Sequence, residues 1–184
     1  MNLPNKITVL RILLIPAFLV VYLAQPLPQL ANNWLSLVLF VVAASTDALD
    51  GYLARRLNLV SNFGKLIDPL ADKLLVCSVL VAFTAVGVVP AWATILIIAR
   101  EFYISGFRQL ALEQNLVVAA SSLGKMKTIF QITLIVYVLL PWPFDFFVFA
   151  PVTYALIIIA VFFTLWSGLD YTTKNLHVFK NKGM

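Results

Sequence analysis

Four aspartates give the strongest chemical signal in this 184-residue sequence: Asp47, Asp50, Asp68 and Asp72 make up half of its eight acidic residues. The first two are three residues apart and the last two are four apart, so each pair shares one face of an α-helix. Two helices joined by a short turn, here around residues 58–62, are antiparallel neighbours, which allows their acidic faces to meet. The spacing therefore predicts four carboxylates that converge on one site.

Carboxylates this close repel one another and need bound cations to stay ionised. Residues 45–73 contain no His or Cys, so the ligands are oxygen atoms, which favour Mg²⁺, Mn²⁺ or Ca²⁺. Two such ions, about 3.5–4 Å apart, form the usual clamp for displacement at phosphorus. Asp72 is the last acid of the series, and a carboxylate beside a metal can take the proton of an attacking hydroxyl. The competing explanation is that the acids only form ion pairs with Arg55, Arg56, Lys65 and Lys73.

A second set of residues could bind an anionic substrate. Its members are basic or hydroxyl residues near charged clusters elsewhere in the chain: Thr8, Arg11, Arg100, Arg108, Lys125 and Lys127. Arg100 and Arg108 are eight residues apart, within about 80° on one helical face. Together with the others they predict a cationic pocket for a substrate that already carries phosphate. Glu101 either pairs with Arg100 or orients a basic neighbour. The alternative is the general bias of membrane proteins toward basic cytoplasmic segments.

Apolar residues dominate the rest of the sequence. Hydrophobic residues make up 62% of the chain and charged residues 11%, with a mean hydropathy of +0.97. A water-soluble domain of this size could not cover so much apolar side chain, so lipid must be the solvent. Basic cytoplasmic segments account for the net charge of +5, and we expect no nucleic-acid partner.

Charged clusters separate three long apolar stretches, residues 12–46, 74–99 and 128–169, the last interrupted only by Asp145. Each exceeds the roughly 20 residues of one span and is broken near its middle: at Gln25–Pro28, at Gly87–Pro90 and at Pro141–Pro143. The pattern predicts an all-α integral membrane protein of six transmembrane helices in three hairpins, forming a single domain over residues 1–184. All 13 Lys and Arg fall on one side of this arrangement, which places both termini and the aspartates at the cytoplasmic face of the cell membrane.

The aspartate motif also carries a family resemblance. Asp47-x-x-Asp50-Gly51-x-x-Ala54-Arg55, followed after eight residues by Gly64-x-x-x-Asp68-x-x-x-Asp72, resembles the signature of the CDP-alcohol phosphotransferases at every fixed position. The resemblance implies a six-helix membrane fold and two divalent cations, Mg²⁺ or Mn²⁺, held by the four aspartates. It further implies that Gly51, Ala54, Arg55 and Gly64 surround the CDP group. Asp72 would be the general base.

Three further segments, "NLPNKITVLRILLIP", "IIAREF" and "LGKMKT", are similar to bacterial phosphatidylglycerophosphate synthases within that family. This resemblance implies attack by glycerol 3-phosphate on CDP-diacylglycerol, giving phosphatidylglycerophosphate and CMP, in an enzyme that pairs as a homodimer. Other acceptors remain open: phosphatidylglycerol, serine or an inositol phosphate. A divalent-cation transporter is the alternative from another class, but it would need acids spread over several membrane depths.

Overall fold

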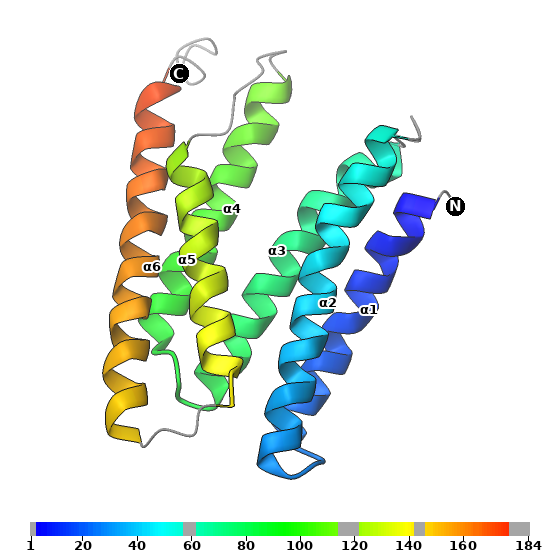
Figure 1. Ribbon diagram of the computed structural model, residues 1–184. Coiled ribbons are helices and arrows are strands. Elements are labelled where there is room, and N and C mark those ends of the chain that lie inside the picture. Colours follow the sequence, from blue (N-terminus) through cyan, green and yellow to red (C-terminus); the bar gives the residue numbers. More distant parts are fainter. Residues whose placement is uncertain (1–2, 57–61, 114–121, 142–145, 177–184) are drawn as a thin grey trace. The chain divides into compact units, whose positions relative to one another are not determined.

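A computed structural model describes residues 3–56, 62–113, 122–141 and 146–176, and these residues form six helices joined without strands. The helices are α1 (Leu3–Ala24), α2 (Gln29–Arg56), α3 (Asn62–Ala85), α4 (Ala91–Glu113), α5 (Ser122–Leu139) and α6 (Phe146–Lys174) (Figure 1). The predicted all-α class and the number of helices are confirmed. The three predicted breaks fall between α1 and α2, between α3 and α4, and between α5 and α6.

Local backbone chemistry ends the first and third helices. Gln25 follows α1 with a φ of 45°, and its N–H donates to the carbonyl of Val21 at 3.2 Å. Gly87 follows α3 with a φ of 77°, a conformation that glycine adopts without a steric penalty. Pro26 and Pro90 lack the N–H that a continuing helix needs. The chain therefore turns where Gly and Pro were expected to break it.

Within the described part of the chain, four helices are long and apolar enough to cross a membrane on their own: α1, α2, α5 and α6. The four charged residues of α2 all follow its apolar segment Gln29–Thr46, whereas the four charged residues in each of α3 and α4 leave no apolar segment of that length. Large apolar side chains lie on the outside of the described helices, among them Leu13, Phe102 and Leu169, which are 62%, 60% and 70% exposed. Such a surface suits lipid and not water. The chain is a membrane protein, and membrane crossing by α3 and α4 stays a prediction.

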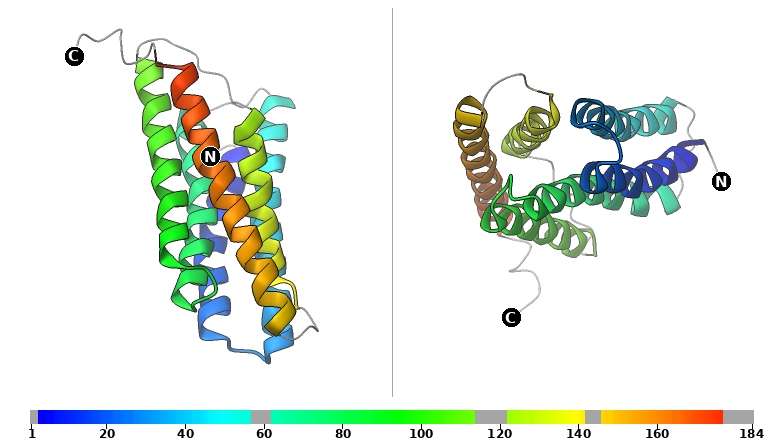
Figure 2. Two further views of the ribbon diagram at one scale, coloured as in Figure 1. Left: turned by 90° about the vertical axis from the view of Figure 1, so that its left-hand side faces the viewer. Right: turned by 90° about the horizontal axis from the view of Figure 1, so that it is seen from below.

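The chain divides into two compact units, Met1–Val88 with Ile135–Pro143, and Val89–Leu134 with Phe144–Met184. In the first unit, α1 packs along both α2 and α3 (Figure 2). The ring of Tyr22 contacts the buried rings of Phe18 and Phe83, at centroid distances of 5.6 and 5.2 Å. Asn32 of α2 donates its side-chain amide to the carbonyl of Val21 at 2.9 Å, which ties the start of α2 to the end of α1.

In the second unit, α4 packs against α6. Their shared core is a cluster of Ile104, Phe107, Ala111 and Tyr171. Residues 122–134 of α5 also belong to this unit, and they join α6 through the stacked rings of Phe130 and Phe163, with centroids 4.5 Å apart. The division into two compact units does not test the expectation that residues 1–184 form a single domain, which stays a prediction.

Candidate functional site

The two acidic segments are helical, as their spacing predicted. Asp47 and Asp50 lie in the last third of α2, and Asp68 and Asp72 lie in the first half of α3. The short segment between the helices, residues 57–61, lies outside the described residues. The surroundings of seven signature residues also lie outside what the structure describes: Asp47, Asp50, Gly51, Ala54, Arg55, Gly64 and Asp68. The helical register is therefore established, while the convergence of the four carboxylates stays a prediction.

The donor set suits hard divalent cations. On a helix, the spacing of Asp47 and Asp50 and that of Asp68 and Asp72 put each pair on one face, and every donor is oxygen. Among the side chains that the structure describes, no group of three or more His, Cys, Asp or Glu could hold a metal ion. Asp72 is the one signature aspartate with a described side chain, and it is exposed on α3 beside the fully buried Ala71.

Two of the predicted anion-binding residues lie in the first unit, on α1. Thr8 and Arg11 are one turn apart and almost completely buried. Arg11 donates its Nε–H to the hydroxyl oxygen of Thr46 at 3.0 Å, and Thr46 donates its own proton to the carbonyl of Ala43 at 2.6 Å. Thr46 directly precedes Asp47, so it fixes a buried cation beside the start of the acidic face. Sequence reasoning missed Thr46, although it is a hydroxyl residue at the end of the uncharged stretch, directly before Asp47.

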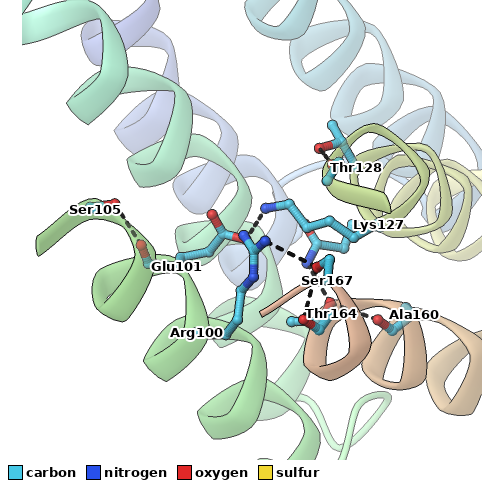
Figure 3. A network of polar contacts seen from close by, with 10 residues as sticks. Arg100, Glu101, Ser105, Lys127, Thr128, Ala160, Thr164 and Ser167 are labelled. Atoms are coloured by element: carbon cyan, nitrogen blue, oxygen red, sulfur yellow. Dashed lines mark hydrogen bonds and ion pairs between the residues drawn. The ribbon is translucent and has the colours of Figure 1, made fainter. Parts of the chain in front are cut away.

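The second unit contains a buried polar network that links α4, α5 and α6 (Figure 3). The Glu101 carboxylate accepts a hydrogen bond from the ammonium of Lys127 and lies 3.5 Å from Nη1 of Arg100. Nη2 of Arg100 donates to the hydroxyl of Ser167 at 3.0 Å. The side chains of Arg100 and Glu101 are each 9% exposed, and that of Lys127 is 11% exposed. Two cations and one anion thus lie together within the unit.

Hydroxyl groups on α6 complete this network. Ser167 donates its proton to the carbonyl of Thr164 at 2.9 Å, which leaves its lone pairs facing Arg100. The Thr164 hydroxyl donates to the carbonyl of Ala160 and accepts from the Gln131 amide at 3.0 Å. A side-chain carbon on Gly168 would lie 3.2 Å from Cγ of Arg100, so the glycine makes room for the arginine. The contacts of Arg100 therefore depend on the Ser167-Gly168 pair.

Arg108 and Lys125 are exposed, unlike Arg100 and Lys127. Arg108 donates its Nε–H to the Tyr171 hydroxyl at 3.2 Å, and its guanidinium carbon lies 5.4 Å from the centroid of the same ring. Both arginines of α4 thus contact α6, as expected for residues that share a helical face. Sequence reasoning missed their partners Ser167 and Tyr171, although "SGLDY" places polar and small residues within the apolar run of α6.

A groove of about 490 Å³ lies between α4 and α6. Its lining is mostly apolar, with hydroxyls at one end and the Arg100 side chain along it: Leu96, Ala99, Arg100, Tyr103, Leu165, Gly168, Leu169, Thr172 and Thr173. The hydroxyl oxygens of Tyr103 and Thr172 are 3.2 Å apart. A lining of this kind suits a hydrocarbon chain with a polar end.

Comparison with known proteins matches residues 1–166 to the CDP-alcohol phosphatidyltransferase family. A CDP-diacylglycerol–glycerol-3-phosphate 3-phosphatidyltransferase of Bacillus subtilis is 44% identical to this chain, over 97% of both proteins. Proteins of the same name from Rickettsia bellii and Mycoplasma genitalium are 37% and 35% identical. These matches cover 92% and 91% of this chain, and 93% and 80% of the relatives. With the six-helix fold and the aspartates in helical register, these matches show that the chain belongs to the CDP-alcohol phosphatidyltransferase family.

Proposed function

We propose that this protein transfers the phosphatidyl group of CDP-diacylglycerol to glycerol 3-phosphate. The observation that carries the proposal is the 44% identity, over 97% of the chain, to a Bacillus subtilis protein with that name. In the reaction, an acceptor hydroxyl oxygen bonds to the phosphorus of the phosphatidyl group, and the bond from that phosphorus to CMP breaks. The products are phosphatidylglycerophosphate and CMP, and no covalent bond to the protein forms.

The aspartates supply the metal site and the base. The family uses divalent cations, and we assign two of them, Mg²⁺ or Mn²⁺, to the four signature aspartates of α2 and α3. When bound, these ions neutralise the diphosphate and the departing CMP. The Asp72 carboxylate takes the proton of the attacking hydroxyl. Its exposure on α3 supports this role, because a base must be reachable by the substrate.

Small and basic residues of the signature bind the CDP group in this proposal. Gly51, Ala54 and Gly64 leave room for the nucleotide to approach the helix backbone. Arg55 adds a fixed positive charge for the phosphates. The phosphate of the acceptor is bound by the basic and hydroxyl set predicted from the sequence: Thr8, Arg11, Arg100, Arg108, Lys125 and Lys127. The contact with Tyr171 supports a role for Arg108, because it orients an exposed guanidinium.

The proposed placement puts the aspartates and both chain ends at the cytoplasmic face of the cell membrane. The distribution of the 13 Lys and Arg residues supports this placement, because none of them falls in the tips of the three hairpins, residues 25–28, 86–90 and 140–145.

We also propose a homodimer, in keeping with the family resemblance. Covalent cross-linking in native membranes tests the dimer, and a monomer band alone after efficient cross-linking contradicts it.

A panel of acceptors tests the reaction. Protein in lipid nanodiscs is supplied with CDP-diacylglycerol and one radiolabelled acceptor: glycerol 3-phosphate, serine, inositol phosphate or phosphatidylglycerol. We expect CMP release and labelled lipid with glycerol 3-phosphate, both abolished by EDTA and restored by Mg²⁺ or Mn²⁺. Efficient use of serine, with glycerol 3-phosphate ignored, would contradict the acceptor. Cation flux into proteoliposomes without any CMP release would instead favour a transporter.

A further inference from the structure

In a buried cluster, Arg100 and Lys127 both lie near the single carboxylate of Glu101. All three side chains are at least 89% buried within the second unit, where an uncompensated charge is unfavourable. Lys127 bonds directly to the Glu101 carboxylate, whereas Arg100 reaches the same oxygen only at 3.5 Å. The closer ion pair is therefore Lys127 with Glu101. Within this trio, Arg100 is the cation that lies farther from the carboxylate.

The guanidinium of Arg100 is also held in one orientation. Glu101 lies beside Nη1, and Ser167 accepts from Nη2 at 3.0 Å. Nε of Arg100 is buried and has no hydrogen-bond partner among the described residues. Gly168 leaves the space that the arginine side chain crosses, because a carbon there would come within 3.2 Å of it. An oriented guanidinium, whose Nε–H has no hydrogen-bond partner among the described residues, is suited to binding an anion.

We propose that Glu101 is a positioning residue for the phosphate of the acceptor substrate. Its carboxylate pairs with Lys127 and, together with Ser167, orients Arg100, whose guanidinium contacts the phosphate. This inference rests on the proposed function and gives two residues of the predicted basic set different roles. Arg100 contacts the phosphate, and Lys127 acts through Glu101.

Substitutions in this network separate positioning from folding. Glu101→Gln removes the carboxylate charge, and the double variant Glu101→Gln with Lys127→Gln removes the ion pair without leaving a buried lysine unpaired. Ser167→Ala removes only the hydroxyl that accepts from Arg100. CMP release in nanodiscs gives kcat and the KM of each substrate for every variant. The double variant and Ser167→Ala decide the question even where Glu101→Gln fails to fold.

Positioning predicts a change that is confined to one substrate. In all three variants the KM for glycerol 3-phosphate rises, by about tenfold without Glu101 and about threefold without the Ser167 hydroxyl, because a misplaced guanidinium binds phosphate less well. The KM for CDP-diacylglycerol stays within about twofold of wild type. Glu101→Asp keeps the charge and restores part of the lost affinity for glycerol 3-phosphate.

Two matched variants serve as controls. Lys174→Gln breaks the ion pair between the exposed Lys174 and Asp170 on α6, and Ser105→Ala removes a hydroxyl that donates to the carbonyl of Glu101 on its own helix. Both should keep the wild-type KM for glycerol 3-phosphate.

Three results would overturn the inference. A double variant with the wild-type KM for glycerol 3-phosphate would show that Glu101 only neutralises Lys127. Equal rises in the KM for glycerol 3-phosphate and the KM for CDP-diacylglycerol in these variants would show a general loss of structure. Unchanged KM values in Ser167→Ala and the double variant would remove Arg100 from the phosphate site. If wild-type protein releases no CMP with glycerol 3-phosphate, the proposed function itself fails and the inference fails with it.

Discussion

Asp72 and Arg11, two residues assigned to the site, lie in opposite environments. Asp72 is exposed on α3, which suits a carboxylate that exchanges a proton with a substrate. Arg11 is fully buried on α1, which suits a fixed cation and demands hydrogen-bond partners. Thr46 is one such partner. Substitution of Asp72 should therefore affect turnover, whereas loss of the Arg11 contact should affect both stability and activity.

We expect Asp72→Asn to lower kcat by about 10²–10⁴-fold, the usual contribution of a general base. The amide is close in size to the carboxylate and the side chain is exposed, so the protein should still fold. CMP release measures turnover, and circular dichroism with thermal unfolding measures the fold. Asp170→Asn, a matched change on α6, should leave turnover near wild type. Full activity of Asp72→Asn would remove Asp72 from the role of base.

The second residue-scale prediction concerns the hydroxyl of Thr46. Thr46→Val keeps the shape of the side chain but leaves Nε of the buried Arg11 without this acceptor, at a cost of about 1–3 kcal/mol in the free energy of unfolding. Thr46→Ser retains the hydroxyl and should restore most of the loss. Thermal unfolding of purified protein compares the two variants. Equal stability of valine and serine at position 46 would show that the bond to Arg11 does not matter.

At the scale of elements, α6 acts as a support for the arginines of α4. Ser167 accepts from Arg100, Gly168 leaves space for its side chain, and Tyr171 accepts from Arg108. Positions 167 and 171 are four residues apart, so one face of α6 meets both arginines. The helix α6 therefore orients both arginines of α4, and small substitutions on α6 should alter the positions of their guanidinium groups.

Gly168→Ala tests this support. The added carbon would lie 3.2 Å from Cγ of Arg100, so the arginine must shift, and we expect kcat/KM for glycerol 3-phosphate to fall about three- to tenfold. The matched control is Gly106→Ala on α4, where an added carbon meets nothing within 4 Å. It should keep full activity and gain about 0.5–1 kcal/mol in stability, because alanine is the better helix former. Equal activity of the two variants would show that the close approach at Gly168 is unimportant.

The helices were predictable from the sequence, whereas the contacts between them were not. Long uncharged runs and their Gly and Pro breaks are local signals, and the helix ends at Ala24, Ala85 and Leu139 agree with them. The partners of Arg100 and Lys127 depend on packing between helices distant in sequence. Ser167 lies 67 residues after Arg100, and Lys127 lies 26 residues after Glu101. No periodicity within one helix could identify such pairs.

At the scale of the whole molecule, charge decides how the chain crosses the membrane. Basic residues resist transfer across a bilayer, so the side with most Lys and Arg stays in the cytoplasm. The turn between α1 and α2 and the turn between α3 and α4 contain none of the 13 basic residues. Both turns should therefore face away from the cytoplasm, provided that α1 to α4 all cross the membrane.

Cysteine labelling tests this arrangement in intact cells. In a Cys77→Ala background, single cysteines replace three exposed apolar residues: Leu27 between α1 and α2, Val86 between α3 and α4, and Leu176 after α6. A membrane-impermeant maleimide should label positions 27 and 86 at once, and position 176 only after the membrane is permeabilised. If position 86 instead behaves like position 176, α3 and α4 do not cross. The six-span prediction would then be wrong, because the charges on these helices would have kept them at the cytoplasmic surface.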